Sequence, residues 1–201
     1  QGPGDHLLVV DSNVGYNKVA ENVHQRLRYA VAIDAADRAQ AHLTIHYSNK
    51  SRPDDRSCDR FRQYVPVYDL LTEGCYWDYV RVYVPLGSEL LPQSDSEAEW
   101  SVSIEGERTV YAMAFMLPQG ASRTLEVAYR LPPETVSDES YRLFVQKQAG
   151  TNALPLEVVC TVGGEVASLE AEPTADSAGS NRISWMTHLL VDREFTVQVR
   201  R

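Results

Sequence analysis

Polar side chains at every second position mark the first candidate site in the chain. Asp11, Asn13 and Asn17 supply side-chain oxygens at this spacing, which is loosely typical of a calcium-binding loop. However, Gly15 comes one position too early for an EF-hand loop, and Asn22 stands where a glutamate would close it. The pattern therefore favours a turn that is held by Asx hydrogen bonds and leads from a strand into a helix, without a metal ion.

Lys18 follows these side chains at the expected start of that helix. The free N–H groups of a helix start attract anions, so an anion site is a further interpretation of the same segment. The sequence favours the simpler one, in which the amides cap the helix and form the turn.

A second candidate site lies on the strand expected at residues 76–84. Side chains alternate across a strand, so one face of this strand carries aromatic and basic groups and the other carries valines. Aromatic rings stack on sugars, and Arg and Tyr dominate protein interfaces. For a central strand, however, the sequence favours packing of this face under the helix or a second sheet. The residues of the face are Trp77, Tyr79, Arg81 and Tyr83.

Other constellations point to no catalytic site. His42 and His46 cannot share a metal ion on a strand, because four residues span about 13 Å there. The paired carboxylates near Asp54 and Asp95 lie in polar loops, where they are solvated and lack the apolar setting that raises the pKa of a glycosidase acid. There is also no Gly-x-Ser-x-Gly nucleophile elbow. We therefore predict no catalytic residues, no metal and no cofactor.

The three cysteines divide into a predicted pair and a single thiol. Cys58 and Cys75 flank a polar loop that precedes the strand at residues 76–84. A disulfide there would stabilise the fold by roughly 3 kcal/mol on a loop-entropy estimate and would indicate an oxidising compartment. Cys160 lies among apolar residues and is expected to be a buried, inert thiol.

The hydrophobic pattern predicts a mainly β fold, a β-sandwich (one large or two small) with one long N-terminal helix. An apolar stripe from Tyr16 to Val31 recurs every three or four residues, which indicates a helix from about residue 17. Pro132-Pro133 suggests a division into residues 1–133 and 134–201, the second part being a sub-domain or a continuation of the same sandwich. The expected strands are 7–10, 41–47, 76–84, 100–104, 109–117, 123–131, 141–147, 154–162 and 189–199.

Charge and hydropathy exclude several classes of partner. The formal net charge is −9, and an acidic surface repels nucleic acid and anionic membranes. No apolar run is long enough to span a bilayer. The opening Gln1-Gly-Pro-Gly4 is typical of a linker, so we expect an excised domain whose anchor lies outside these residues.

Three stretches together resemble the C-terminal, extracytoplasmic region of the bacterial domain-of-unknown-function family 4012. They are residues 8–18 (LVVDSNVGYNK), 68–88 (YDLLTEGCYWDYVRVYVPLGS) and 146–151 (QKQAGT). The resemblance implies a membrane helix upstream of residue 1 and a location outside the cell membrane, which fits a Cys58–Cys75 disulfide. Members of the family are suspected of roles near surface polysaccharide, but no activity or catalytic residue transfers.

The sequence thus favours a non-enzymatic extracytoplasmic module of a membrane-anchored bacterial surface protein, which binds a protein partner or an envelope glycan. The alternative is an enzyme that acts on cell-envelope polysaccharide with its site at Asp11–Lys18. A concave polar pocket at these residues would favour the enzyme, whereas their use in caps and turns would count against it. Calcium-dependent adhesion is a third possibility.

Overall fold

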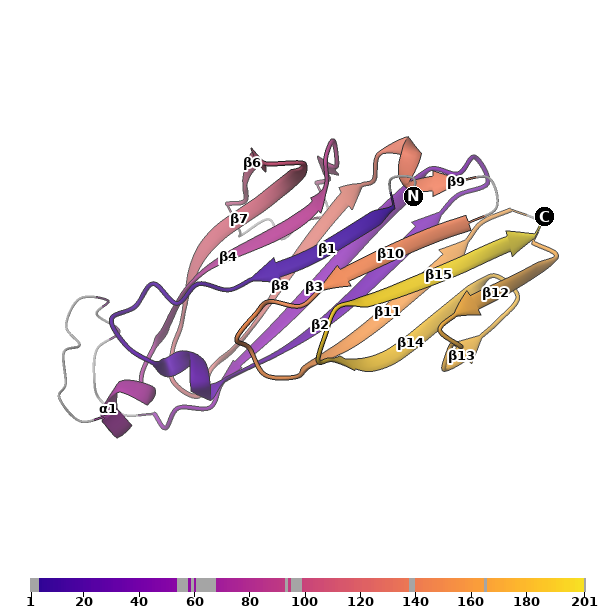
Figure 1. Ribbon diagram of the computed structural model, residues 1–201. Helices are drawn as coiled ribbons and strands as arrows, with labels where there is room; N and C mark the ends of the chain where they lie inside the picture. The colour runs from indigo at the N-terminus through magenta and orange to yellow at the C-terminus, as the bar shows by residue number, and fades with distance from the viewer. Residues whose placement is uncertain are drawn as a thin grey trace.

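The computed structural model describes residues 4–53, 58, 60, 68–92, 94, 99–137, 140–164 and 166–200. Two β-sheets pack face to face, and the two ends of the chain lie at the same end of the sandwich (Figure 1). The predicted mainly β sandwich is therefore confirmed.

We call the two sheets A and B. Sheet A has the order β12 (Ser168–Glu172), β15 (Arg193–Arg200), β10 (Ser140–Gln146), β1 (Asp5–Val10), β4 (Tyr76–Pro85), β7 (Arg108–Leu117), β6 (Ser101–Glu105), and β9 (Val136–Ser137) pairs with β10. Sheet B has the order β13 (Ser177–Ala178), β14 (Arg182–Leu189), β11 (Leu154–Val162), β2 (Val23–Ile33), β3 (Ala39–Asn49), β8 (Ser122–Arg130), β5 (Glu89–Leu90). The short helices are η1 (Val19–Asn22), α1 (Tyr68–Thr72) and η2 (Pro133–Thr135).

A parallel strand pair joins the two halves of the chain in each sheet. β1 runs parallel to β10 in sheet A, and β2 runs parallel to β11 in sheet B. The other strand pairs in the described part of the chain are antiparallel, as hairpin connections allow. Strands from both sides of residue 133 therefore lie in both sheets, and the predicted division there stays a prediction.

The long N-terminal helix is the part of the predicted fold that is wrong. Only one turn of 3-10 helix, η1, follows the Asp11–Lys18 segment, and residues 23–33 form the strand β2. The apolar positions fit a period of two as well as a helical period, because Leu27, Tyr29 and Val31 all point into the core. β2 is paired along its length with β3 and parallel to β11, so backbone hydrogen bonds at both edges stabilise the strand.

The core between the sheets is rich in tyrosine. Tyr29, Tyr47, Tyr111, Tyr129 and Tyr141 are all fully buried there. A buried tyrosine hydroxyl usually needs a hydrogen-bond partner, so this core has to contain polar acceptors as well as apolar side chains.

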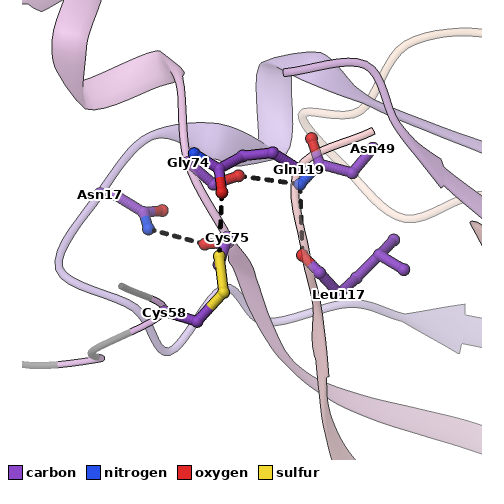
Figure 2. Close-up of a disulfide and its surroundings, with 7 residues drawn as sticks. All are labelled: Asn17, Asn49, Cys58, Gly74, Cys75, Leu117 and Gln119. Atoms are coloured by element: carbon purple, nitrogen blue, oxygen red, sulfur yellow. Dashed lines mark hydrogen bonds between the residues drawn. A yellow bond between two sulfur atoms is a disulfide. The ribbon is translucent and has the colours of Figure 1, made fainter. Parts of the chain in front are cut away.

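The Cys58–Cys75 disulfide is present, as predicted, with a Cα–Cα distance of 5.4 Å. Figure 2 shows side-chain amides bonded to the backbone around it. Asn17 Nδ2 donates to the carbonyl of Cys75 at 3.1 Å, and Asn49 Nδ2 donates to the carbonyl of Gly74 at 2.8 Å. The bridge indicates an oxidising, extracytoplasmic environment.

Two further observations complete the fold. Cys160 is a buried free thiol, as predicted, and burial raises its pKa to about 12.

Within the described ranges, no helix has the length and apolar character needed to cross a membrane.

Candidate functional site

Asp11 lies at the end of β1, where backbone hydrogen bonds from two sides hold it. The amide side chain of Gln148 binds both backbone groups of Asp11, accepting from its N–H at 3.0 Å and donating to its carbonyl at 2.9 Å. The next residue, Ser12, exchanges two backbone hydrogen bonds with Tyr79 of β4, at 3.2 and 3.0 Å. Parts of residues 8–18, 68–88 and 146–151, which are far apart in the sequence, therefore meet at Asp11.

The side chain of Asp11 points between the sheets and accepts hydrogen bonds from sheet B. The hydroxyl of Tyr47 donates to Oδ1 at 2.6 Å, and Nε2 of Gln25 donates to Oδ2 at 2.9 Å. Gln25 and Tyr47 also contact each other at 3.1 Å. Gln25 of β2 and Tyr47 of β3 lie opposite each other in sheet B. The position of the Asp11 carboxyl group is therefore fixed by sheet B as well as by its own backbone.

A second carboxyl group, Asp78 of β4, lies behind Asp11 and is fully buried. Neither of its oxygens meets a donor at bonding geometry, which would be costly for an ionised carboxylate. Burial, and next the charge of Asp11, raise the pKa of Asp78 to about 8. We therefore expect Asp78 to keep its proton at neutral pH and to offer it to the neighbouring carboxyl group.

Burial also raises the pKa of Asp11, but the hydrogen bonds from Tyr47, Asp78 and Gln25 oppose this shift. Two carboxyl groups in contact titrate as a pair. Asp11 is the member with donors of its own, whereas Asp78 has none at bonding geometry. When the pair ionises, Asp11 is therefore the better place for the negative charge.

Asp11 faces a cleft of about 580 Å³ at this end of the sandwich. Apolar side chains of both sheets and of the loop before β11 form one part of the lining, namely Leu7, Val9, Val23, Leu27, Ala153, Leu154, Pro155 and Leu189. Polar residues form the rest, namely Asp11, Asn13, Glu21, His24, Gln25, Gln146, Lys147, Gln148, Thr151, Asn152 and His188. Both Tyr47 and Tyr76 also contribute to the lining.

Asn13 and Asn17 hold the turn, although Asn13 also lies in the cleft lining. Nδ2 of Asn13 donates to Oδ1 of Asn17 at 2.9 Å, and Oδ1 of Asn13 accepts from the N–H of Gly15 at 2.9 Å. Oδ1 of Asn17 also accepts from the N–H of Val19 at 3.2 Å. The predicted Asx turn is confirmed, and it leads into the short helix η1 that precedes β2.

Lys18 does not point to the same site as Asp11. Its ammonium group lies over the ring of Tyr68, 4.9 Å from the ring centre, and it is not part of the cleft lining. The structure therefore separates Lys18 from the carboxyl group with which the sequence grouped it.

The aromatic face of β4 lies on the outer side of sheet A. Val80 and Val82 of the same strand are buried between the sheets, so Trp77, Tyr79, Arg81 and Tyr83 point away from sheet B. The expectation that this face packs under a helix or a second sheet is wrong. Instead, the hydroxyl of Tyr83 accepts from Arg81 at 3.0 Å and donates to Glu105 at 2.8 Å.

Asp78, Gln25, Tyr47 and Gln148 are site residues that the sequence reasoning missed. One signal for Asp78 was available. It occupies an inward position of β4 among valines, and a carboxyl group at such a position is unusual unless it has a structural or functional role. Gln148 belongs to the stretch 146–151 on which the family resemblance depends. For Gln25 and Tyr47, residue type and spacing carried no signal.

The two strand histidines, which the sequence excluded as a metal pair, lie away from the cleft lining. His42 and His46 are on the outer side of sheet B, where His46 Nδ1 and Thr124 Oγ1 are 3.1 Å apart. In the part of the chain that the structure describes, no three His, Cys, Asp or Glu side chains are grouped as metal ligands.

The comparisons with known proteins find similarity among solved structures. No protein-family model matches the sequence, and no curated protein matches it. A crystal structure of a candidate nutrient binding protein from Legionella pneumophila is similar with a TM-score of 0.48 and 6% sequence identity, over 98% of this chain and 71% of that chain. A likeness at this level says nothing about function. The resemblance to family 4012 stays a prediction.

Proposed function

We propose that the chain is a non-enzymatic, extracytoplasmic binding module that takes its ligand in the cleft at Asp11. One observation carries the proposal. A carboxyl group with its position fixed on several sides faces a cleft of about 580 Å³ between the ends of the two sheets. Mixed apolar and polar lining with a few oriented polar groups is typical of ligand sites.

The site is held in place before any ligand arrives, which lowers the entropy cost of binding. Gln148 fastens the loop after β10 to Asp11, and the turn amides fasten the segment after β1 to the start of β4. The Cys58–Cys75 disulfide joins the same region covalently. These contacts support a rigid receptor for a small group rather than a surface that forms on binding.

Binding is better supported than the alternative, hydrolysis of envelope polysaccharide. Glycosidases that use two carboxyl groups keep them about 5–9.5 Å apart so that the sugar or a water fits between them. Here Asp78 is fully buried and is not part of the cleft lining that Asp11 belongs to. In addition, Asn13 and Asn17 serve the turn, which is the outcome expected of a non-catalytic segment.

The proposed location is the outside of a bacterial membrane, on a protein anchored by a segment upstream of residue 1. The disulfide supports an oxidising compartment, and the anchor rests on the family resemblance. In that setting, the partners to consider are an envelope glycan and a protein. Surface protease accessibility of the full-length protein in intact cells is the test of location, and protection of this domain would contradict it.

The binding proposal is tested by NMR titration of the ¹⁵N-labelled chain with three probes. These are a soluble muropeptide, a neutral N-acetylglucosamine tetramer and a lysine-containing hexapeptide. We expect at least one of them to shift the amide signals of residues 9–25 and 146–154. If none shifts them, or if the shifts map to the outer side of sheet A, the cleft is not the binding site and the proposal fails.

A further inference from the structure

Resting on the proposed function, we infer that the cleft binds a primary ammonium group on an aliphatic stem, with the ammonium at Asp11 and the stem along the apolar lining. A lysine side chain, the free amine of a muropeptide peptide stem, and a simple alkylamine all share this chemistry. The inference goes beyond the binding proposal because it states what kind of group the cleft recognises.

The first argument is that the carboxyl groups of Asp11 and Asp78 have no cationic partner. Neither forms an ion pair with a Lys or Arg among the residues that the structure describes. Asp78 is fully buried, and neither of its oxygens has a hydrogen-bond partner at bonding geometry. A carboxylate inside a protein normally has a partner, so a cationic ligand at Asp11 would supply what the chain leaves out.

The second argument is that the geometry of Asp11 leaves acceptor capacity unused. A carboxylate can accept about four hydrogen bonds. The carboxyl oxygens of Asp11 receive one from Tyr47 and one from Gln25. Because Asp11 also lines the cleft, the unused acceptor capacity is available to a ligand in the cleft.

The third argument concerns Lys147, the lysine in the cleft lining. Its ammonium group donates to the carbonyl of Gln148 at 3.0 Å, to the carbonyl of Thr151 at 2.7 Å and to Oγ1 of Thr151 at 2.9 Å. An ammonium group has three donors, and all three are used within its own loop. Lys147 is therefore not available to neutralise Asp11.

The fourth argument separates an amine from a neutral sugar. Sugar rings bind best on exposed aromatic faces, but the aromatic rings of Tyr47 and Tyr76 in the cleft lining are only 1% and 3% exposed. The more exposed side chains of Val23, Leu154 and Pro155 offer aliphatic contact instead. Aliphatic walls that lead to a carboxylate suit an alkylamine better than a sugar ring.

The experiment compares matched pairs of probes in the same NMR titration. The first pair is n-pentylamine and 1-pentanol, which differ in the charged group. The second pair is a muropeptide and the same muropeptide with its free amine acetylated. We expect the amine of each pair to shift the signals of residues 9–25 and 146–154, and to bind at least about ten-fold more tightly than its neutral partner, since a charge-assisted hydrogen bond is involved.

Two variants locate the effect. Asp11→Asn keeps the shape of the side chain but removes its charge, and we expect it to lose at least about ten-fold in pentylamine affinity. Glu107→Gln removes the same charge from the exposed turn between β6 and β7 and should change nothing. Because the pentylamine and pentanol comparison uses the unaltered protein, it decides the inference even if Asp11→Asn fails to fold.

The outcomes separate the two proposals. If acetylated and free muropeptide bind the cleft equally well, the cleft is a binding site but the ammonium inference is wrong. If Glu107→Gln weakens pentylamine binding as much as Asp11→Asn does, the effect is general attraction to an acidic protein, and the inference is again wrong. If neither muropeptide, tetramer nor peptide reaches the cleft, the proposed function itself fails.

Discussion

Asp5 and Asp11 lie at the two ends of β1, and both side chains point between the sheets, yet their surroundings differ. Asp5 is 2% exposed and accepts hydrogen bonds from the hydroxyl of Tyr29 at 2.5 Å, from the hydroxyl of Tyr141 and from the N–H of His6 at 2.7 Å. Tyr129 extends this network by donating to the Tyr29 hydroxyl at 3.2 Å. Asp11, by contrast, has two neutral donors, a second carboxyl group behind it and an open cleft in front.

The difference shows how to tell a structural carboxyl group from a binding one. At Asp5, tyrosine hydroxyls from β2 and β10 and a backbone N–H supply the donors that a buried carboxyl group needs, and the group is almost fully shielded from solvent. At Asp11, two side-chain donors leave acceptor capacity unused next to the cleft, and a second carboxyl group opposes ionisation. A buried carboxyl group that is saturated with donors holds the fold together, whereas an unsaturated one next to a cleft is what our binding proposal rests on.

The largest expected effect is on stability at the saturated end. Asp5→Leu removes the acceptor of the Tyr29 and Tyr141 hydroxyls and leaves both buried without a partner, so we expect a loss of about 3–5 kcal/mol in the free energy of unfolding. Asp11→Asn, at the open end, should cost about 1 kcal/mol. Urea denaturation at pH 7 measures both. Equal losses would mean that the two carboxyl groups play the same role.

Removal of the disulfide tests the region around Asp11, at the open end of the comparison. Cys58→Ser together with Cys75→Ser should lower the free energy of unfolding by roughly 3 kcal/mol, because the unfolded chain regains the freedom of the loop. Hydrogen exchange should show weaker protection at residues 12–18 and 76–79, near the cleft. Protection around Asp5 should stay unchanged, and a uniform loss along β1 would contradict the separation of the two ends.

The pH dependence of stability should differ between the two carboxyl groups. Burial raises the pKa of Asp5 to about 6 and of Asp78 to about 8, so the folded state binds more protons than the unfolded state between about pH 4 and these values. Stability must then fall as the pH rises through this window. From about pH 6 to 8 we expect a loss of about 2 kcal/mol, due mainly to Asp78.

Asp78→Asn is the variant that checks this assignment. It should abolish the decrease between about pH 6 and 8 and reduce the decrease between about pH 4 and 6 to the part that Asp5 contributes. Chemical denaturation at half-unit pH steps makes the comparison, and Glu107→Gln serves as the charge control. A decrease above pH 6 that persists in Asp78→Asn would show that the carboxyl pair does not hold a proton at neutral pH.

The smallest effect is expected on the outer side of sheet A. Tyr83→Phe removes the hydroxyl that connects Arg81 to Glu105, a partly exposed contact, and should cost less than about 1 kcal/mol. It should not alter the NMR response of the cleft to pentylamine. A clear loss of muropeptide binding in Tyr83→Phe would instead make the aromatic face part of the binding surface.

Much of the sandwich could be predicted, because strict alternation in residues 41–47, 76–84 and 123–131 leaves one interpretation. The region from Tyr16 to Val31 could not, since its apolar residues satisfy a helical and a strand period together. There the decision came from pairing with β3 and β11, and such long-range partners are not visible in a local pattern. The Tyr141 strand and the Cys58–Cys75 disulfide were predictable from composition and spacing.

The site was predicted only in part. Asp11 stood out through its neighbours Asn13 and Asn17, but these amides proved to hold the turn rather than a ligand. Asp78 joins Asp11 because β4 runs beside the segment that follows β1, and this depends on the sheet order. The local pattern offered one signal, a carboxyl group whose side chain points between the sheets. Asp5, Asp11 and Asp78 all show it, so the signal could not tell which of them lie at the cleft.

The two parallel strand pairs have a consequence for how the chain matures during synthesis and export. β1 and β2 appear early, but they gain their neighbours β10 and β11 only when residues 140–162 have followed. Contacts this distant in sequence form slowly, whereas Cys58 and Cys75 can meet as soon as both have emerged. Because residues 146–155 and 188–189 complete the cleft, the cleft cannot form before most of the chain has been made.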